Sequence, residues 1–215
     1  MHYTCRDPRD PDGIPLDAFV PHAIEPILQR LRPDYVINCI GILNQYAERN
    51  EAAAFRINGK FPHEVKEALE PQGGMLIHIS TDCVFSGESG FHTENHPPDG
   101  KSVYARSKIV GEVICSRHLT IRTSIIGPEV REQGIGLLHW FLQQTGTVHG
   151  YVNALWNGVT TLELAKVIHG MTLRPVSGLV HLTAPEPINK YNLLRRFQDV
   201  FDKKKMWKSC RTTGL

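Results

Sequence analysis

The sequence predicts an α/β fold with a parallel, doubly wound sheet. Short apolar runs of strand length, at residues 35–40, 75–79 and 119–126, alternate with longer helical patterns. Each run stops at a glycine or at small polar residues, as strands do where they leave a sheet. Because strands joined through helices run in the same direction, this alternation favours parallel pairing over hairpins.

Other elements lie before and between these runs in the first part of the chain. In chain order they are a short strand at residues 1–6, a turn at 7–13, a helical pattern at 19–31 closed by Pro33, and a long helix at about 51–70 that contains Pro62. After Gly127 the pattern of predicted strands and helices changes. The elements predicted there are helices at residues 137–144, 160–169 and 188–201 and strands at 147–152 and 179–182. The helix at 160–169 begins at hydroxyl caps and is expected to bury four residues: Leu162, Leu164, Ala165 and Ile168.

Composition narrows the class of protein. A chain of 215 residues with a net charge of +2 and no basic stripe argues against nucleic acid as the main partner. Five scattered cysteines without a Cys-x-x-Cys favour free thiols in a reducing compartment. The eleven histidines lack the spacing of a metal site, so no metal is expected. With no apolar run of membrane-spanning length and no visible signal peptide, we expect a cytoplasmic protein that does not enter the membrane.

Polar side chains follow the run at residues 75–79, where the predicted strand ends. Ser80, Thr81 and Asp82 place two hydroxyls and a carboxylate at its carboxyl end. Open α/β sheets bind their ligands at that edge, so these three residues indicate a site.

Tyr104 and Lys108 are spaced i, i+4 at the start of the next helical pattern, so they share one face of the helix. An ammonium beside a phenol lowers the pKa of the phenol and allows proton exchange near neutral pH. Thr81 would hydrogen-bond the same reacting oxygen. This spacing also occurs by chance on solvated helix faces, and the preceding strand end is what favours catalysis. Four residues are expected to form the apolar stripe of this helix: Ile109, Val110, Val113 and Ile114.

Three segments together resemble the extended short-chain dehydrogenase/reductases, and within them the dTDP-4-dehydrorhamnose reductase group. Residues 80–87 read STDCVFSG, residues 104–112 read YARSKIVGE and residues 121–127 read IRTSIIG, in the family's order. The resemblance extends over about residues 6–201. It implies a Rossmann-type sheet, incomplete at the N-terminus, with a small C-terminal substrate lobe. Residues 1–127 would form the truncated NAD(P)-binding domain, and residues 128–215 the sugar-nucleotide-binding lobe, with some return to the first domain.

The resemblance also implies a reaction, the NADP-dependent reduction of a nucleotide-linked 4-keto-6-deoxy sugar for cell-surface polysaccharide synthesis. NAD is the alternative cofactor. Tyr104 would donate the proton, Thr81 would hydrogen-bond the developing alkoxide, and Lys108 would lower the pKa of Tyr104 and hold the nicotinamide ribose. Asn58 matches the family's asparagine on the helix behind the site, with a supporting role. Seven residues would bind the cofactor: Arg6, Asp17, Cys39, Ile40, Gly41, Tyr104 and Lys108.

The nucleotide-sugar substrate would contact four residues: Asp82, Cys83, Ile125 and Arg131. Cys83 stands where the rhamnose enzymes commonly have tyrosine, and Ile125 where they often have tryptophan. Both departures fit better with amino- or deoxy-sugar reductases, so the particular sugar is left open. His139, Trp140, Trp156 and Asn157 are further candidates, although ordinary packing is the favoured explanation for the two tryptophans.

The glycine-rich phosphate loop of a dinucleotide-binding fold does not occur in the sequence, which contains no Gly-x-Gly-x-x-Gly and no Gly-x-x-Gly-x-x-Gly. In the family's arrangement residues 1–6 resemble the second strand, and residues 16–17 the end of the third. We therefore expect a fragment that lacks about 30 residues before Met1. A natural short form that has given up the cofactor is the alternative.

Two other functions remain open. One is a non-catalytic regulatory or scaffold protein of the same fold, against which the joint presence of Thr81, Tyr104 and Lys108 argues. The other is a nucleotide-sugar epimerase or dehydratase. Dehydratases usually carry acidic residues just after the catalytic Thr, and only Asp82 stands there. A homodimer is compatible with the resemblance, but the sequence does not determine the oligomeric state.

Overall fold

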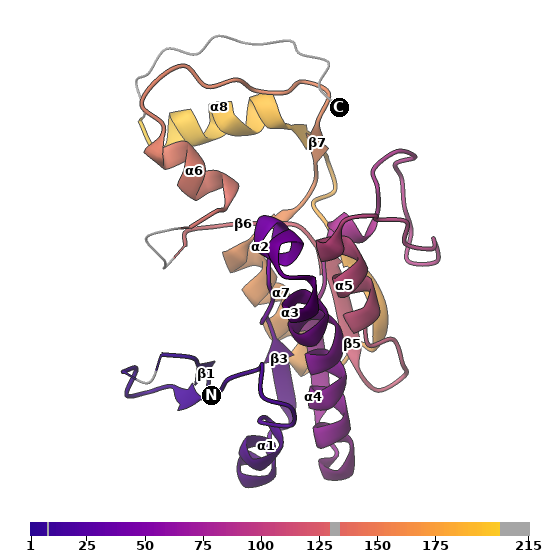
Figure 1. Ribbon diagram of the computed structural model, residues 1–215. Coiled ribbons are helices and arrows are strands. Elements are labelled where there is room, and N and C mark those ends of the chain that lie inside the picture. The colour runs from indigo at the N-terminus through magenta and orange to yellow at the C-terminus, as the bar shows by residue number, and fades with distance from the viewer. Residues whose placement is uncertain (8, 130–133, 203–215) are drawn as a thin grey trace. The chain divides into compact units, whose positions relative to one another are not determined.

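The computed structural model describes residues 1–7, 9–129 and 134–202 (Figure 1). The chain forms two compact units. The first comprises Met1–Arg122 and Pro175–His181, and the second comprises Thr123–Arg174 and the described residues from Leu182 on. The functional roles predicted for the two parts of the chain are a separate matter and stay predictions.

A four-stranded sheet in the order β3-β4-β5-β9 organises the first unit. Its strands are β3 Tyr35–Asn38, β4 Met75–Ile79, β5 Leu119–Thr123 and β9 Gly178–Leu182. β3, β4 and β5 pair in parallel, with Asn38 beside His78 and His78 beside Thr120. The predicted parallel sheet is therefore confirmed. A separate parallel pair is formed by β1 Thr4–Cys5 and β2 Ile14–Pro15.

Helices connect these strands. They are α1 Glu25–Leu31, α2 Asn44–Arg49, α3 Glu51–Ala54, η1 Phe55–Lys60, α4 Phe61–Leu69, η2 Glu70–Gln72, η3 Asp82–Val84 and α5 Val103–Gly111. α1 is shorter than predicted, because Phe19 lies among turns before it and is 43% exposed. Pro21 disfavours helical backbone at the residue before it, and Asp17 Oδ1 accepts a hydrogen bond from Phe19 N at 3.0 Å. Pro33 lies just beyond Arg32, whose φ of 44° ends the helix.

The long helix predicted around residues 51–70 is confirmed, with a π turn in its middle. α3, η1, α4 and η2 follow one another without a break, and η1 has the π-helical hydrogen-bond pattern. Pro62 has no N–H to donate to the carbonyl of Asn58, four residues earlier, which favours a local change of pattern. A Cβ at Gly111 of α5 would lie 1.8 Å from that same carbonyl oxygen. The glycine therefore allows α5 to approach η1 closely.

The predicted apolar stripe is confirmed only in part: Val113 is buried in the core, but two of its other residues are exposed. Val110 is 51% exposed and Ile114, beyond the end of the helix, is 58% exposed. The buried residues of α5 are Val103, Ala105, Ser107, Lys108 and Gly111. The residues of α5 that are buried thus include the small residues Ala105, Ser107 and Gly111 and also the charged Lys108.

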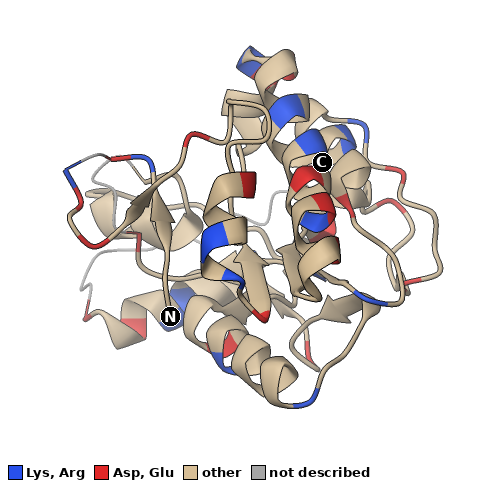
Figure 2. Cartoon of the chain, turned by 90° about the horizontal axis from the view of Figure 1, so that it is seen from below, with Lys and Arg blue, Asp and Glu red and all other residues tan. Residues whose placement is uncertain are grey.

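The core of the first unit lies where α1, η1 and α4 pack with strand residues. Ten buried residues form the main apolar cluster: Leu16, Ala18, Ile24, Leu28, Ile57, Phe61, Val65, Leu69, Leu76 and Val113. Basic and acidic residues are interspersed over the described helices and loops (Figure 2). None of the described helices combines the length and apolar character that a membrane span requires.

The second unit contains three helices and four short strands among its described residues. They are β6 Ile125–Ile126, α6 Leu137–Gln143, β7 Leu155–Trp156, β8 Val159–Thr160, α7 Thr161–Leu173, β10 Ile188–Asn189 and α8 Lys190–Val200. β6 pairs in parallel with β8, and β10 is antiparallel to β7. The long strand predicted at residues 119–126 is interrupted at Ser124, which separates β5 from β6.

Two further expectations for the second unit are wrong. Residues 147–152 form no strand in the structure, and their backbone contact is the Tyr151 carbonyl, which accepts from Tyr191 N at 3.2 Å. An apolar run becomes a strand only where a neighbouring strand offers a ladder. In α7, Leu164 and Ile168 are buried as predicted, whereas Leu162 is 64% exposed and Ala165 is exposed too.

Candidate active site

The predicted catalytic hydroxyls come together at the carboxyl end of β4. Thr81 follows the strand, is buried, and begins η3 by accepting from Cys83 N at 3.2 Å. Tyr104 lies in the first turn of α5, which Ser102 caps by accepting from Ala105 N at 3.0 Å. The Thr81 hydroxyl donates to Asp82 Oδ1 at 3.3 Å and lies near enough to the Tyr104 phenol to lower its pKa. A strand end and a helix start thus bring a hydroxyl pair to the ligand-binding edge of the sheet.

The protonation of Tyr104 corrects the sequence-based expectation. Burial raises the pKa of Tyr104 to about 12, and Cys83 and Asp82 add to this, while the Thr81 hydroxyl opposes it. The predicted lowering by Lys108 is absent, because Lys108 makes its contacts elsewhere. At neutral pH the phenol is therefore protonated and able to donate.

Lys108 is buried against β4, with 4% of its surface exposed. Its Nζ donates to the Ile79 carbonyl at 2.8 Å and lies 3.4 Å from His78 Nε2. Burial lowers the pKa of Lys108 to about 8, although the Glu112 carboxylate acts in the opposite direction. Its predicted role at a nicotinamide ribose stays a prediction.

Asn58 is fully buried and holds two segments of the site together. Its Oδ1 accepts from Ile42 N at 2.8 Å, and its Nδ2 donates to the Ile42 carbonyl at 2.9 Å. The same Nδ2 donates to Ser107 Oγ at 3.0 Å. With these contacts Asn58 orders the loop after β3 and anchors α5, which is a positioning role.

Of the residues predicted to bind cofactor, those outside α5 lie in loops and just after strands. Residues 39–41 follow β3, and the Ile40 amide donates to Asn38 Oδ1 at 3.1 Å. Arg6 follows β1 and is exposed, while Asp17 follows β2 and is exposed. A lysine amine, a phenol and an accessible backbone loop form a donor set that suits the ribose and nicotinamide of a dinucleotide. The residues present therefore fit the reacting end of that cofactor.

The four residues expected at the substrate differ in where they lie. Asp82 and Cys83 are exposed in η3, and both raise the pKa of Tyr104, so they lie near the phenol. Ile125 begins β6 in the second unit and is 46% exposed. Arg131 lies outside the described residues.

All four additional substrate candidates also have structural contacts, including the Trp140 carbonyl, which accepts from Gln144 Nε2 at 3.0 Å. Trp156 Nε1 donates to Ser124 Oγ at 2.9 Å, and the Asn157 carbonyl accepts from Ala184 N at 2.6 Å. His139 Nε2 lies 2.7 Å from Gln143 Nε2. Trp140 is 40% exposed, so it is not part of a closed core.

A buried ion pair behind the site was not predicted. Glu112 accepts from Arg122 at 2.8 and 2.7 Å, and both side chains are 3% exposed. Ser80 Oγ donates to Glu112 Oε1 at 2.8 Å, which ties the strand end to the end of α5. The sequence did contain both partners within the family-like segments, because Glu112 ends the segment at residues 104–112 and Arg122 lies in the segment at residues 121–127. What was missing was their proximity, which only the packing of β5 supplies.

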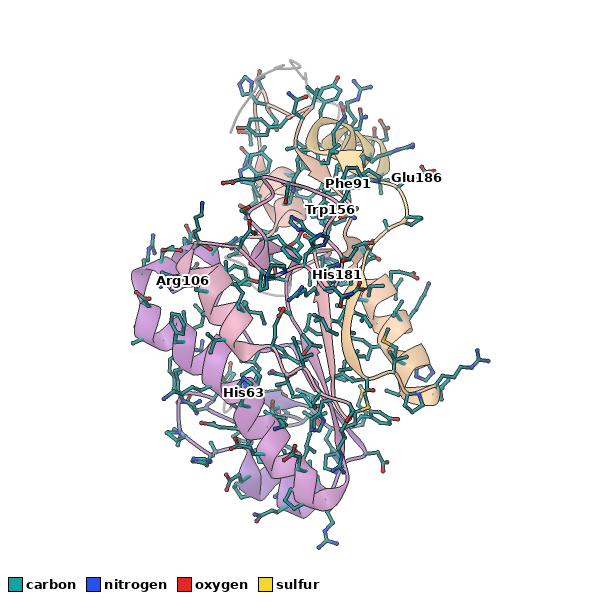
Figure 3. All side chains as sticks on the ribbon, turned by 90° about the vertical axis from the view of Figure 1, so that its right-hand side faces the viewer. His63, Phe91, Arg106, Trp156, His181 and Glu186 are labelled. Atoms are coloured by element: carbon teal, nitrogen blue, oxygen red, sulfur yellow. The ribbon has the colours of Figure 1, made fainter. Side chains whose placement is uncertain are left out.

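Helix α5 is held from a second side by α4 and α3. His63 Nε2 donates to the Val110 carbonyl at 2.8 Å, and Arg106 pairs with Glu51 at 3.0 Å (Figure 3). No cluster of metal-ligating side chains occurs in the part of the chain that the structure describes.

The family match and the fold place the chain among the extended short-chain dehydrogenase/reductases. The chain belongs to the family described as the RmlD substrate binding domain, whose model matches residues 9–211. The dTDP-4-dehydrorhamnose reductase of Mycobacterium tuberculosis (strain ATCC 25618 / H37Rv) is 40% identical over 104 residues, which cover 45% of this chain and 33% of that relative. Methionine adenosyltransferase 2 subunit beta of Danio rerio is 27% identical over 194 residues, 84% of this chain and 59% of that one.

The fold matches solved structures of the same group. The dTDP-4-dehydrorhamnose reductase from Bacillus anthracis str. Ames, in complex with NADP, superposes with a TM-score of 0.80 at 20% identity. The match covers 92% of this chain and 73% of that one. It establishes the Rossmann-type α/β fold. The chain spans about a third of the length of the first curated relatives it matches, so their activity is carried over only as a proposal.

Proposed function

We propose that this chain carries the catalytic site of an NADP-dependent reductase of a nucleotide-linked 4-keto-6-deoxy sugar, acting in polysaccharide precursor synthesis. NAD is the alternative cofactor. The proximity of Thr81 to Tyr104 at the carboxyl end of β4, with Lys108 buried on the same helix, is the observation that carries this proposal. The scattered cysteines of the sequence, none in a Cys-x-x-Cys, suit the cytoplasm, where we place the reaction. We leave monomer and homodimer as alternatives.

The chemistry divides between cofactor and protein. The nicotinamide supplies hydride when it is bound. Tyr104 donates its proton to the oxygen of the sugar's keto group as that oxygen becomes an alkoxide. A phenol with a pKa of about 12 is protonated at neutral pH and can serve as this acid. Thr81 hydrogen-bonds the same oxygen and keeps it within reach of Tyr104.

Other residues hold the cofactor in this proposal. Lys108 would contact the ribose hydroxyls next to the nicotinamide, and the backbone of residues 39–41 would line the ring. Asp17 would lie toward the adenine. Arg6 would pair with the 2′-phosphate, which distinguishes NADPH from NADH.

A comparison of substrates tests the proposal. NADPH oxidation is followed with a dTDP-4-keto-6-deoxy sugar and, as control, with dTDP-glucose, which has no keto group. The proposal predicts oxidation with the keto sugar alone. Conversion of dTDP-glucose without net use of NADPH would instead identify an epimerase or dehydratase and overturn the proposal.

A second candidate has support of its own. The relative that matches over 84% of this chain is a subunit by its printed name, methionine adenosyltransferase 2 subunit beta. We therefore keep a non-catalytic, subunit-type role as the alternative. It predicts no turnover of any keto sugar by a chain that still binds NADPH, and the same assay combined with a binding titration distinguishes the two.

A further inference from the structure

Lys108 is connected to the loop after β3 through two buried side chains. His78 is 0% exposed and Asn38 is 3% exposed, and the two are neighbours across β4 and β3. Asn38 Nδ2 lies 3.2 Å from His78 Nδ1, and His78 Nε2 lies 3.4 Å from Lys108 Nζ. Asn38 Oδ1 accepts from Ile40 N at 3.1 Å. These contacts form one chain from the backbone amide of Ile40 to the amine of Lys108.

The direction of each hydrogen bond in this series, from Ile40 to Lys108, follows from its first donor, the Ile40 amide. A backbone N–H can only donate, so the Asn38 oxygen must face Ile40 and the Asn38 NH₂ must face His78. His78 Nδ1 is then an acceptor. A neutral imidazole carries one proton, which must therefore be on Nε2, the nitrogen that faces Lys108.

This arrangement has a consequence for Lys108. An Nε2–H group directed at an ammonium would place two donors face to face, whereas a neutral amine has a lone pair that can accept the proton of Nε2–H. The neutral amine can still donate to the Ile79 carbonyl, its other contact. The hydrogen-bond chain and the second contact are thus both satisfied when Lys108 is uncharged.

We propose that Asn38 and His78 are positioning residues that fix Lys108 and favour its neutral form by presenting His78 Nε2–H to its amine. The functional meaning of this device rests on the proposed role of Lys108 in the reductase. It makes the charge of the lysine depend on the loop that would line the cofactor, because the Ile40 amide sets the orientation of Asn38. Neither residue contacts substrate in this scheme.

Other titratable groups also act on this pair. The Glu112 carboxylate on α5 and the Cys39 thiol in the loop after β3 raise the pKa of Lys108, while burial lowers it. Burial, Lys108 and His63 on α4 all lower the pKa of His78, so its imidazole is neutral at pH 7. A neutral ring is what the tautomer argument requires.

The tautomer of His78 is the first test, and it needs neither substrate nor cofactor. The ring nitrogens of ¹⁵N-labelled wild-type protein are read by NMR, and the signals of His78 are assigned by their loss in His78→Gln. A protonated Nε2 with an unprotonated Nδ1 is expected. The opposite tautomer would overturn the proposal even if Asn38→Asp failed to fold.

Asn38→Asp is the second test, because its carboxylate accepts from both neighbours. It should move the His78 proton to Nδ1, leave Nε2 as an acceptor, and raise the pKa of Lys108 by about one unit or more. The pKa is followed through the Lys108 side-chain NMR signal, assigned by its loss in Lys108→Met. Asn50→Asp is the matched control, since it adds the same charge at the N-cap of α3.

The tautomer of His78 and the pKa of Lys108 in Asn38→Asp together test the proposal. A flipped tautomer with an unchanged Lys108 pKa would show that His78 does not set the lysine's charge. A raised pKa without a flip would show a simple charge effect. Either result overturns the proposal and leaves the reductase function untouched, whereas absent turnover with the expected NMR behaviour would count against the reductase alone.

Discussion

The two ends of the central sheet treat buried polar groups in opposite ways. At the carboxyl end of β4, Ser80 and Thr81 are buried, and each has a hydrogen-bond partner. At the amino end, His118 is fully buried and accepts from Leu76 N, yet its Nε2 has no hydrogen-bond partner among the described residues. The nearest acidic atom, Glu70 Oε1, is 3.9 Å away.

The amino end is also hollow. An open cavity of about 460 Å³ lies there, lined in part by Asp34, Tyr35, Gly73, Met75 and Arg117. The carboxyl end, by contrast, brings together Thr81, Tyr104 and the buried Lys108 with its contacts. Burying a polar group without a partner destabilises a fold, whereas a network whose members all have partners makes the region rigid. In this sheet, buried polar groups that have hydrogen-bond partners lie at the candidate site, whereas the buried group that lacks one among the described residues lies at the opposite end.

The largest effect is expected from breaking the ion pair at the carboxyl end. Glu112→Gln leaves the Arg122 guanidinium buried without its counter-charge, which should lower the free energy of unfolding by about 3–5 kcal/mol. Urea unfolding measures this loss. Glu163→Gln is the control, because its ion pair with Lys166 is exposed and should contribute less than about 1 kcal/mol. Equal losses for both variants would show that the buried pair has no special weight.

Removal of the proposed acid should affect turnover rather than folding. Tyr104→Phe keeps the ring and deletes the proton, so kcat should fall by roughly 10²-fold or more while the Kd for NADPH changes little. The control is Tyr151→Phe, a half-exposed tyrosine of the second unit. A Tyr104→Phe protein that retains most of its kcat would remove this residue from the mechanism.

A smaller effect is expected at the carboxyl end of β1. Arg6→Ala should weaken NADPH binding by about tenfold, because one charge-assisted contact to the 2′-phosphate is lost, and leave NADH binding unchanged. Titration with both cofactors measures this. Arg9→Ala removes another exposed arginine, one that pairs with Asp7, and serves as the control. Equal losses for the two cofactors would contradict the assignment.

The smallest effect is the acid sensitivity that the two buried histidines share. The pKa values of His78 and His118 both lie below 6.5, chiefly because of burial. The unfolded chain then binds more protons than the folded one, so stability is lost as pH falls below about 6.5, by up to about 1.4 kcal/mol per pH unit and group. Urea unfolding of His78→Gln and His118→Gln across this range should show a weaker pH dependence. The reduction in pH dependence should be larger for His78→Gln than for His118→Gln, because the pKa of His78 is lowered further.

Much of this protein follows from local pattern. The strands at residues 35–38 and 75–79 and the helical stretch at 51–72 were predicted within a few residues, because their apolar spacing and turn residues act within a short window. The proximity of Thr81 to Tyr104 was also predictable, since a strand end and the next helix start meet at one edge of an α/β sheet.

Other features depended on partners distant in the sequence. Whether residues 147–152 become a strand depends on a neighbouring ladder, and the buried face of α5 depends on the close approach of Gly111 to η1. The spacing of Tyr104 and Lys108 predicted that both residues lie on one helix. It did not predict the direction in which the Lys108 amine points. Lys108 turns to the Ile79 carbonyl and His78, so burial sets both pKa values in ways that spacing alone does not contain.

The sequence by itself therefore determined the fold class and predicted which groups would react, because both inferences depend on residue types at short, regular spacings. Only the tertiary structure decided the ionisation of Tyr104 and Lys108 and the pairing of Glu112 with Arg122. Those properties arise from desolvation and from contacts between separate strands and helices, which exist only once the chain has packed.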